Sequence, residues 1–144
     1  MSVRERTLLG HWGAVIVSPE ILILVVEDDG DIQNLLEEAL TEAGFAVKQA
    51  MSGQAAIELL DSKDFHFRAL VTDIDLKSEL TGWDVARHAR EITPDLPVIY
   101  ATSNLQDWGS MGVPNSIPIA KPYAPSQIVT AVSQLLNATP ASET

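Results

Sequence analysis

Short apolar segments that alternate with amphipathic segments restrict the fold of this chain more than any other feature of its sequence. The first is ILILVV at residues 21–26, a continuous apolar run bounded by Pro19 and by the acidic residues that begin at Glu27. A run with no polar face is typical of a strand that is buried on both sides. Four further strands are expected, at residues 45–50, 68–72, 96–102 and 116–120. Pro118 lacks an N–H for the ladder, so the last of them is expected at an edge of the sheet.

Amphipathic helices are expected between these strands. Apolar residues recur at helical spacing from Ile32 until Gly44 ends the helix. Further helices are expected from the N-cap Ser52 to about Leu60, from Gly82 to about Ile92, and from Pro125 onward. Two glycines and a proline within residues 103–116 leave room for only a short helical piece near Leu105–Trp108. The alternation predicts one α/β domain, a doubly wound five-stranded parallel sheet with helices on both faces and a short or broken fourth helix.

Polar residues follow four of the five expected strands. They are Glu27, Asp28 and Asp29 after the first strand, Asp73 and Asp75 at the third, Thr102 and Ser103 at the fourth, and Lys121 with Pro122 at the fifth. The carboxyl ends of parallel strands meet at one edge of the sheet, where ligands of such folds bind. Taken singly, each residue has an ordinary explanation as a helix cap, a loop acid, a strand-end hydroxyl or a surface lysine. Their joint placement instead predicts one site at which several acids converge.

A hard cation would relieve the repulsion among acids at such a site. Mg²⁺ prefers oxygen ligands and is typically held by one or two carboxylates together with phosphate oxygens. An aspartate can act as a nucleophile toward phosphorus and form an acyl phosphate. The Lys121 ammonium would neutralise charge on the transferring oxygens, and the Thr102 hydroxyl would donate a hydrogen bond to one of them. The pattern therefore predicts chemistry on phosphate, with one carboxylate as the reagent and its neighbours as metal ligands.

Composition narrows the classes of partner and site. The 20 acidic residues outnumber the 9 lysines and arginines for a net charge of -11, which argues against nucleic acid as the partner. The chain has no cysteine, which excludes thiolate metal sites, cysteine nucleophiles and disulfides. No apolar run approaches the roughly 20 residues that a membrane-spanning helix needs. Residues 1–19 are expected to form an N-terminal extension rather than a signal peptide, because His11, Trp12 and Pro19 interrupt the apolar patch.

Four motifs together resemble the receiver domain of response regulators in bacterial two-component signalling. They are VVEDD at 25–29, LVTDIDL at 70–76, YATS at 100–103 and AKPY at 120–123. The resemblance covers residues 20–138 and leaves 139–144 as a disordered tail. It implies a flavodoxin-like sheet with strand order 2-1-3-4-5, and a cytoplasmic signalling phosphoacceptor that is no enzyme beyond its own aspartyl phosphorylation and dephosphorylation. Because no output domain is expected after residue 138, the chain resembles a stand-alone receiver.

The resemblance implies a role for each acid of the site. Asp73 would accept the phosphoryl group from a histidine kinase, a hybrid kinase or a phosphotransfer protein, with Mg²⁺ as the cofactor. Asp28 and Asp73 would coordinate Mg²⁺ directly, and Glu27 would do so through a water molecule. The backbone carbonyl of Asp75 would supply a further ligand. Asp29 is not assigned to the metal.

The resemblance extends to the residues around the phosphoryl group and to the output. Thr102 and Lys121 would contact the phosphoryl group, and the bond between Lys121 and Pro122 would be cis. The phosphorylated chain would then dock an unidentified downstream protein, or serve as a phosphate shuttle or sink. Neither nucleic acid nor a membrane is expected as a partner.

Three features depart from the pattern of the family. Pro118 stands where most receivers place an aromatic residue whose rotamer reports phosphorylation, and Tyr100 or Tyr123 could either substitute for it or simply pack. The segment between the fourth and fifth strands is compressed. In the loop after Asp75, Lys77 replaces the usual proline and Gly82 falls one place later than in the commonest pattern.

Two alternative functions stay open on the sequence. A pseudo-receiver would keep the fold as a binding module without being phosphorylated, and Pro118 with the compressed fourth helix favours it. A phosphatase of the haloacid-dehalogenase type is suggested by the D-x-D pattern of Asp73-Ile74-Asp75. Against the phosphatase, its D-x-D would lie on the first strand, and the chain is too short for a cap domain.

Overall fold

A computed structural model describes residues 20–138, so the predicted extension at 1–19 and the predicted tail at 139–144 lie outside the described residues. Its strands and helices alternate in this order: β1 (Leu22–Val26), α1 (Gly30–Glu42), β2 (Ala46–Ala50), α2 (Gly53–Asp61), β3 (Phe67–Asp73), α3 (Gly82–Ile92), β4 (Val98–Thr102), the 3₁₀ turn η1 (Leu105–Asp107), α4 (Trp108–Met111), β5 (Ser116–Ala120) and α5 (Pro125–Ala138). Each strand begins and ends within two residues of its predicted bounds.

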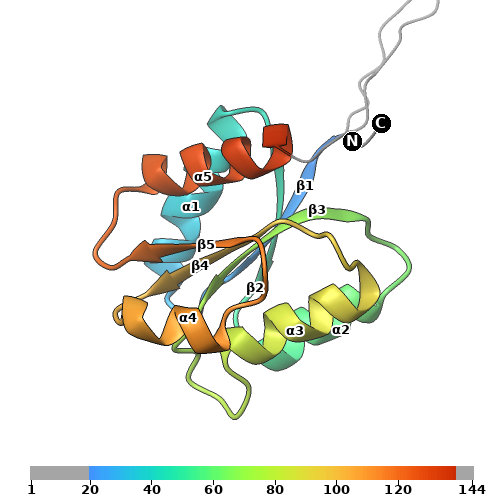
Figure 1. The fold of residues 1–144 in the computed structure, drawn as a ribbon. Helices are drawn as coiled ribbons and strands as arrows, with labels where there is room; N and C mark the ends of the chain where they lie inside the picture. The colour runs from blue at the N-terminus through green and yellow to red at the C-terminus, as the bar shows by residue number, and fades with distance from the viewer. Residues whose placement is uncertain (1–19, 139–144) are drawn as a thin grey trace, which may run out of the picture.

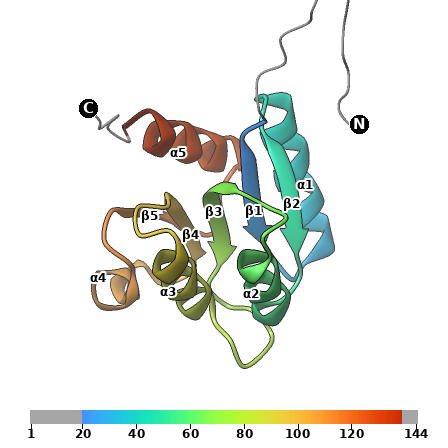
Figure 2. The same cartoon turned by 90° about the vertical axis from the view of Figure 1, so that its right-hand side faces the viewer.

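The five strands form one parallel sheet in the order β2-β1-β3-β4-β5 (Figures 1 and 2). This confirms the predicted fold class and strand order. Pro118 lies on the edge strand β5, opposite Tyr100 of β4, as its missing N–H led us to expect.

Helices cover both faces of the sheet, with α1 and α5 on one face and α2 and α3 on the other (Figure 1). Along β1, Ile23 and Val25 pack on the α1–α5 side, while Leu24 and Val26 pack on the α2–α3 side. All four side chains are at most 1% exposed. The apolar run of β1 is continuous because neither side of this strand faces solvent.

Side-chain caps fix where the helices start. Asp29 accepts hydrogen bonds from the N–H groups of Asp31 and Ile32 and so caps α1, and Ser52 caps α2 in the predicted way. At α3, Thr81 and Asp84 form a reciprocal capping box. These caps set the residue at which the chain leaves each loop at the carboxyl ends of the strands and enters the next helix.

The connection between β4 and β5 confirms the short fourth helix, because α4 has only 4 residues. A chain of hydrogen bonds holds it in place. The Trp108 Nε1–H donates to Ser116 Oγ (2.9 Å), which donates to the Val113 carbonyl (2.6 Å), and the Val113 N–H donates to the Tyr100 hydroxyl (3.1 Å). Trp83 packs on Tyr100 from α3, with 4.6 Å between the ring centroids.

Tyr100 and Tyr123, the two aromatic residues that could substitute for the one missing at position 118, both pack against the core. Tyr100 is fully buried, and Tyr123 packs against the cluster between the sheet and the α1–α5 layer. Within residues 20–138, no helix combines the length and the apolar character that crossing a membrane requires.

Candidate functional site

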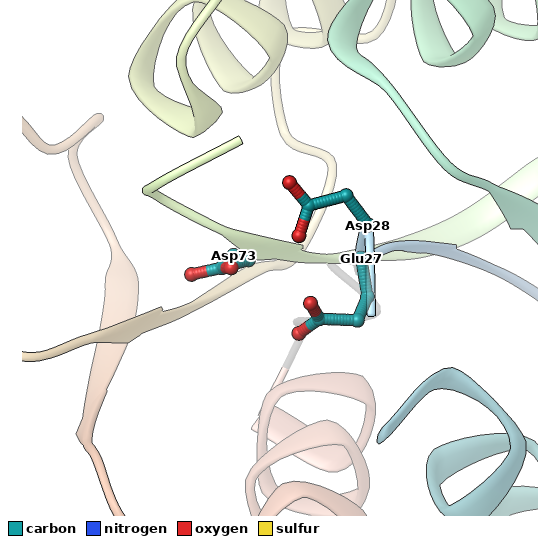
Figure 3. Close-up of side chains that lie close together, drawn as sticks. All are labelled: Glu27, Asp28 and Asp73. Atoms are coloured by element: carbon teal, nitrogen blue, oxygen red, sulfur yellow. The ribbon is translucent and has the colours of Figure 1, made fainter. Parts of the chain in front are cut away.

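Three acids converge at the carboxyl ends of β1 and β3. Glu27 and Asp28 directly follow β1, and Asp73 is the last residue of β3. Because β1 and β3 are parallel neighbours, their ends meet at the same edge of the sheet. One carboxylate oxygen from each residue lies within 4.8 Å of the others, and Figure 3 shows the three side chains gathering there. The sequence placed these acids on one edge, and the structure brings them into one cluster.

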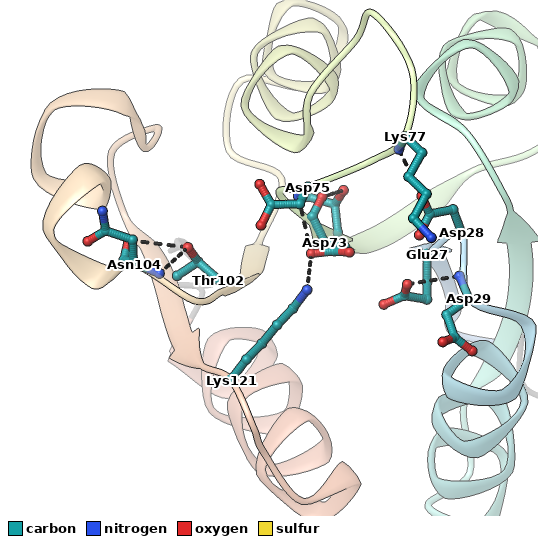
Figure 4. Close-up of polar contacts among 10 residues, drawn as sticks. Glu27, Asp28, Asp29, Asp73, Asp75, Lys77, Thr102, Asn104 and Lys121 are labelled. Atoms are coloured by element: carbon teal, nitrogen blue, oxygen red, sulfur yellow. Dashed lines mark hydrogen bonds and ion pairs between the residues drawn. The ribbon is translucent and has the colours of Figure 1, made fainter.

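Lys121 reaches this cluster from the end of β5, as Figure 4 shows. Its Nζ donates a hydrogen bond to Asp73 Oδ1 at 2.5 Å. The Lys121 N–H also donates to the Thr102 carbonyl (2.9 Å), which ties the end of β5 to the end of β4. The bond between Lys121 and Pro122 is cis, as the resemblance implied.

Burial makes the charged forms of these acids unfavourable. Glu27 is 3% exposed, and its burial raises its pKa to about 7, although the hydrogen bond from the Asp29 N–H opposes the shift. Charge repulsion from Asp73 and Asp28 raises the pKa of Glu27 further. Asp73 is 4% exposed, and its burial raises its pKa while the hydrogen bond from Lys121 lowers it. A cation in the cluster would remove both the repulsion and part of the desolvation cost.

The remaining predicted site residues lie beside the cluster with less direct contacts. The side chain of Asp75 is exposed. The main-chain N–H of Asp75 donates a hydrogen bond to Asp73 Oδ1 at 3.3 Å. Ala101 lies opposite Asp73 in the sheet, so Thr102 is one residue beyond that position. The Thr102 hydroxyl accepts from the Asn104 N–H (3.0 Å) and donates to the Asn104 carbonyl (3.2 Å), so in this structure it bonds to its own turn.

Two contacts at the site have no direct signal in the sequence. The main-chain N–H of Lys77 donates to Asp28 Oδ2 at 2.8 Å, which joins the loop after β3 to the acid after β1. The buried Gln33 donates through Nε2 to the Ala50 carbonyl (3.0 Å), an oxygen that also accepts from the Glu27 N–H. Gln33 therefore fixes α1 and the end of β2 around the segment that carries Glu27. A residue other than proline at position 77 permits the first contact but does not predict it.

The donor set fits a hard divalent cation. Glu27, Asp28 and Asp73 offer carboxylate oxygens within 4.8 Å of one another, and Mg²⁺ binds oxygen in preference to nitrogen or sulfur. Lys121 bonds to Oδ1 of Asp73, which leaves Oδ2 of the same carboxylate for another partner. The cluster therefore combines the oxygen donors of a divalent-cation site with an adjacent ammonium group.

Comparison with known sequences assigns the chain to a family. Residues 23–133 match the family model described as response regulator receiver domain. A response regulator receiver protein CpdR of Brucella abortus is 40% identical over 80 residues, which are 56% of this chain and 64% of that relative. The response regulator SaeR of Staphylococcus aureus is 29% identical over 119 residues, which are 79% of this chain and 50% of SaeR. The chain thus spans less than two thirds of the length of these curated relatives.

Solved structures agree with this assignment. A response regulator receiver protein from Sinorhizobium medicae is 43% identical, with a TM-score of 0.80 over 83% of this chain and 96% of that one. The receiver domain of the sensor histidine kinase PA1611 from Pseudomonas aeruginosa shares the fold at 24% identity, with a TM-score of 0.71 over 83% of this chain and 100% of that one. That structure holds a magnesium ion in its active-site cleft. The match to receivers leaves the haloacid-dehalogenase alternative without support.

Proposed function

The chain belongs to the response regulator receiver family of two-component signalling, and on that premise we propose that Asp73 accepts a phosphoryl group from a histidine kinase or a phosphotransfer protein. The observation that carries the proposal is the convergence of three acids and one ammonium at a single edge of the sheet. Holding these acids together is costly for the fold, since burial of Glu27 and Asp73 opposes their ionisation.

In the proposed reaction, a carboxylate oxygen of Asp73 forms a bond to phosphorus. The bond between phosphorus and the donor breaks at the same time, and its electron pair leaves on the donor nitrogen or oxygen. Lys121, which already contacts Asp73 Oδ1, places positive charge beside the transferring oxygens. The Thr102 hydroxyl would contact a phosphoryl oxygen after giving up its bond to the Asn104 carbonyl.

The acids of the cluster would hold Mg²⁺. Asp28 and Asp73 would be direct ligands, Glu27 would bind through a water molecule, and the backbone carbonyl of Asp75 would complete the protein's share. Bound Mg²⁺ supplies positive charge that neutralises the transferring phosphoryl group. Ionised Glu27 is unfavourable without a counter-charge, so the cation and the charged form of Glu27 support each other.

The output of the phosphorylated chain would be the docking of a downstream protein or the onward transfer of the phosphoryl group. Pro118 has no side-chain rotamer that could follow the Thr102 hydroxyl, so the signal must leave the site by another route. The segment between β4 and β5 would be this route, because it connects Thr102 to Lys121, the two residues that would contact the phosphoryl group. The Lys121 N–H also donates a hydrogen bond to the Thr102 carbonyl and so joins the ends of these strands.

The test is chemical phosphorylation followed by intact mass. Incubation of the wild-type chain with Mg²⁺ and acetyl phosphate should add the mass of one phosphoryl group, and Asp73→Asn should remove the addition. Asp75→Asn is the matched control, because the Asp75 side chain is exposed and the proposal uses only its carbonyl. Equal labelling of wild type and Asp73→Asn would overturn Asp73 as the acceptor.

A pseudo-receiver is the second candidate, and two observations favour it. Pro118 removes the usual aromatic reporter, and the Thr102 hydroxyl bonds within its own turn. The two candidates differ in the same assay. A wild-type chain that binds Mg²⁺ and stays unlabelled by acetyl phosphate would favour the binding module over the phosphoacceptor.

A further inference from the structure

One hydrogen bond at the site joins two segments that are far apart in the sequence. The main-chain N–H of Lys77 donates to Oδ2 of Asp28 at 2.8 Å, across a separation of 49 residues (Figure 4). Proline, which receivers usually have at this position, carries no N–H and could not make this bond. The bond is therefore a property of this chain's own sequence in the loop from residue 74 to residue 81.

The loop that carries Lys77 is anchored on both sides of it. Before Lys77, the side chain of Leu76 is 6% exposed and belongs to the α2–α3 side of the core. After it, Leu80 packs so closely on α2 that a Cβ at Gly53 would lie 2.6 Å from the Leu80 Cβ. Gly82 closes the loop with a hydrogen bond from its N–H to the Ile74 carbonyl (3.0 Å). These anchors hold the loop on both sides of the exposed Lys77 and so limit where its N–H can lie.

We propose that the main-chain N–H of Lys77 positions Asp28 as a Mg²⁺ ligand and thereby couples the β3–α3 loop to occupancy of the metal site. The inference rests on the proposed function, since it assumes that the acid cluster binds Mg²⁺. The bond from Lys77 fixes the orientation of the Asp28 carboxylate, which would be one of the groups that hold the ion. A ligand whose orientation is fixed in advance loses less conformational freedom on binding than a free side chain does.

The size of the effect follows from other metal sites. Removing a hydrogen bond to a metal-bound ligand typically weakens metal binding by about 10- to 100-fold. The coupling also works in reverse, because two equilibria that share a contact shift each other equally. Mg²⁺ should therefore stabilise the Lys77 hydrogen bond and slow solvent exchange of the Lys77 amide hydrogen.

The decisive comparison is between Lys77→Pro and Lys77→Ala. Both variants lack the ammonium group, and only the proline variant also lacks the N–H. Calorimetric titration of the metal-free chains with Mg²⁺ should give an affinity about tenfold weaker for Lys77→Pro than for Lys77→Ala. Lys77→Ala should bind Mg²⁺ as tightly as wild type or more tightly, because it removes a positive charge that repels the cation. Equal affinities of the two folded variants would overturn the inference.

A second measurement decides the matter if Lys77→Pro does not fold. Amide hydrogen exchange at Lys77 should slow when Mg²⁺ is added to the wild-type chain. In the absence of metal, exchange should accelerate in Asp28→Ala but not in Asp28→Asn, whose side-chain carbonyl still accepts the bond. A Lys77 amide that exchanges at the same rate with and without Mg²⁺ would refute the coupling.

The outcomes separate this inference from the proposed function. If the wild-type chain binds no Mg²⁺, both fail. If it binds Mg²⁺ and acetyl phosphate labels Asp73, while Lys77→Pro and Lys77→Ala bind Mg²⁺ equally, the proposed function stands and only the role of Lys77 is overturned.

Discussion

The acid cluster (Glu27, Asp28 and Asp73) and the β4–β5 edge (Tyr100, Trp108, Val113 and Ser116) differ in how their polar groups affect stability. In the cluster, Glu27 and Asp73 are almost fully buried, and burial raises the pKa of each. At the edge, Tyr100, Trp108 and Ser116 are neutral groups that bond to one another or to the main chain between β4 and β5. The three carboxylates of the cluster therefore outnumber the single Lys121 ammonium that reaches them, whereas each of these neutral groups at the edge has a hydrogen-bond partner. Residues of the first kind reduce the stability of the free chain, and residues of the second kind contribute to it.

The largest expected effect comes from a substitution at Gly82, where α3 packs against the main chain of Asp73 in the acid cluster. A Cβ at Gly82 would lie 2.1 Å from the carbonyl oxygen of Asp73 and 2.9 Å from the Cα of Ile74. Gly82→Ala should lower the free energy of unfolding by about 3 kcal/mol or more, since the backbone must move. Urea denaturation measures this.

The matched control for Gly82 lies in α4. A Cβ added at Gly109 would meet no atom within 4 Å, and the backbone there is not in the left-handed region. Gly109→Ala should therefore change the free energy of unfolding by less than about 1 kcal/mol. Similar losses for the two alanine variants would mean that the close approach of Gly82 to the Asp73 carbonyl does not constrain the fold.

The next largest effect is a dependence of stability on pH, which arises from Glu27 in the acid cluster. The raised pKa of Glu27 means that, from about pH 4.5 to pH 7, the folded chain holds a proton that the unfolded chain has released. The free energy of unfolding therefore falls as the pH rises through this window. Relative to Glu27→Gln, the metal-free wild type should lose about 2 to 3 kcal/mol between pH 4.5 and pH 8.

Chemical denaturation of both chains in EDTA at a series of pH values gives this difference. Well below pH 4.5, Glu27 is neutral in both the folded and the unfolded state, so the two chains should be similar in stability. Saturating Mg²⁺ should abolish the loss in the wild type at high pH. A difference between the chains that is independent of pH would show that ionised Glu27 is not a cost to the free fold.

At the β4–β5 edge, Tyr100→Phe should lower the stability of the fold and leave Mg²⁺ affinity unchanged. It removes the hydroxyl that accepts the Val113 N–H and leaves that buried donor without its partner. An unpaired buried N–H costs about 1 to 2 kcal/mol, so thermal unfolding should begin at a lower temperature. Mg²⁺ affinity should stay unchanged, because the hydrogen bond of the Tyr100 hydroxyl is to Val113 on the β4–β5 connection, away from the acids' own bonds. Loss of Mg²⁺ binding in this variant would mean that the two regions are not separable.

The smallest effect is expected for Trp108→Phe. The substitution removes the Nε1–H that donates to Ser116 Oγ but keeps an aromatic ring in the half-buried position. Because Ser116 still donates to the Val113 carbonyl, the loss should be about 1 kcal/mol. Differential scanning calorimetry measures it. A loss above that of Tyr100→Phe would place the main support of the edge at Trp108 instead.

The same two regions differ in how far the sequence predicts them. Strand ends and charges place Glu27, Asp28, Asp73 and Lys121 on one edge, because parallel strands and acidic residues are both visible in a sequence. The Lys77 contact with Asp28 is not visible in this way, since it is made by a main-chain N–H that every residue except proline carries.

The β4–β5 connection shows the same limit. Its glycines and Pro114 predict a short helix, and α4 is short. The sequence does not indicate that the Tyr100 hydroxyl bonds to Val113, or that Ser116 accepts from the Trp108 indole, because these pairings depend on how the loop folds back over β4. Nor does it show that the Thr102 hydroxyl bonds to Asn104 rather than pointing freely at the site.

The most direct test of the central claim is a crystal structure of the chain grown with Mg²⁺ and beryllofluoride, which mimics a phosphoryl group on a carboxylate. We predict beryllium bonded to a carboxylate oxygen of Asp73, Mg²⁺ between that group and Asp28, and Lys121 Nζ within hydrogen-bonding distance of a fluorine. An adduct on another carboxylate, or Mg²⁺ bound away from Asp28 and Asp73, would contradict the account.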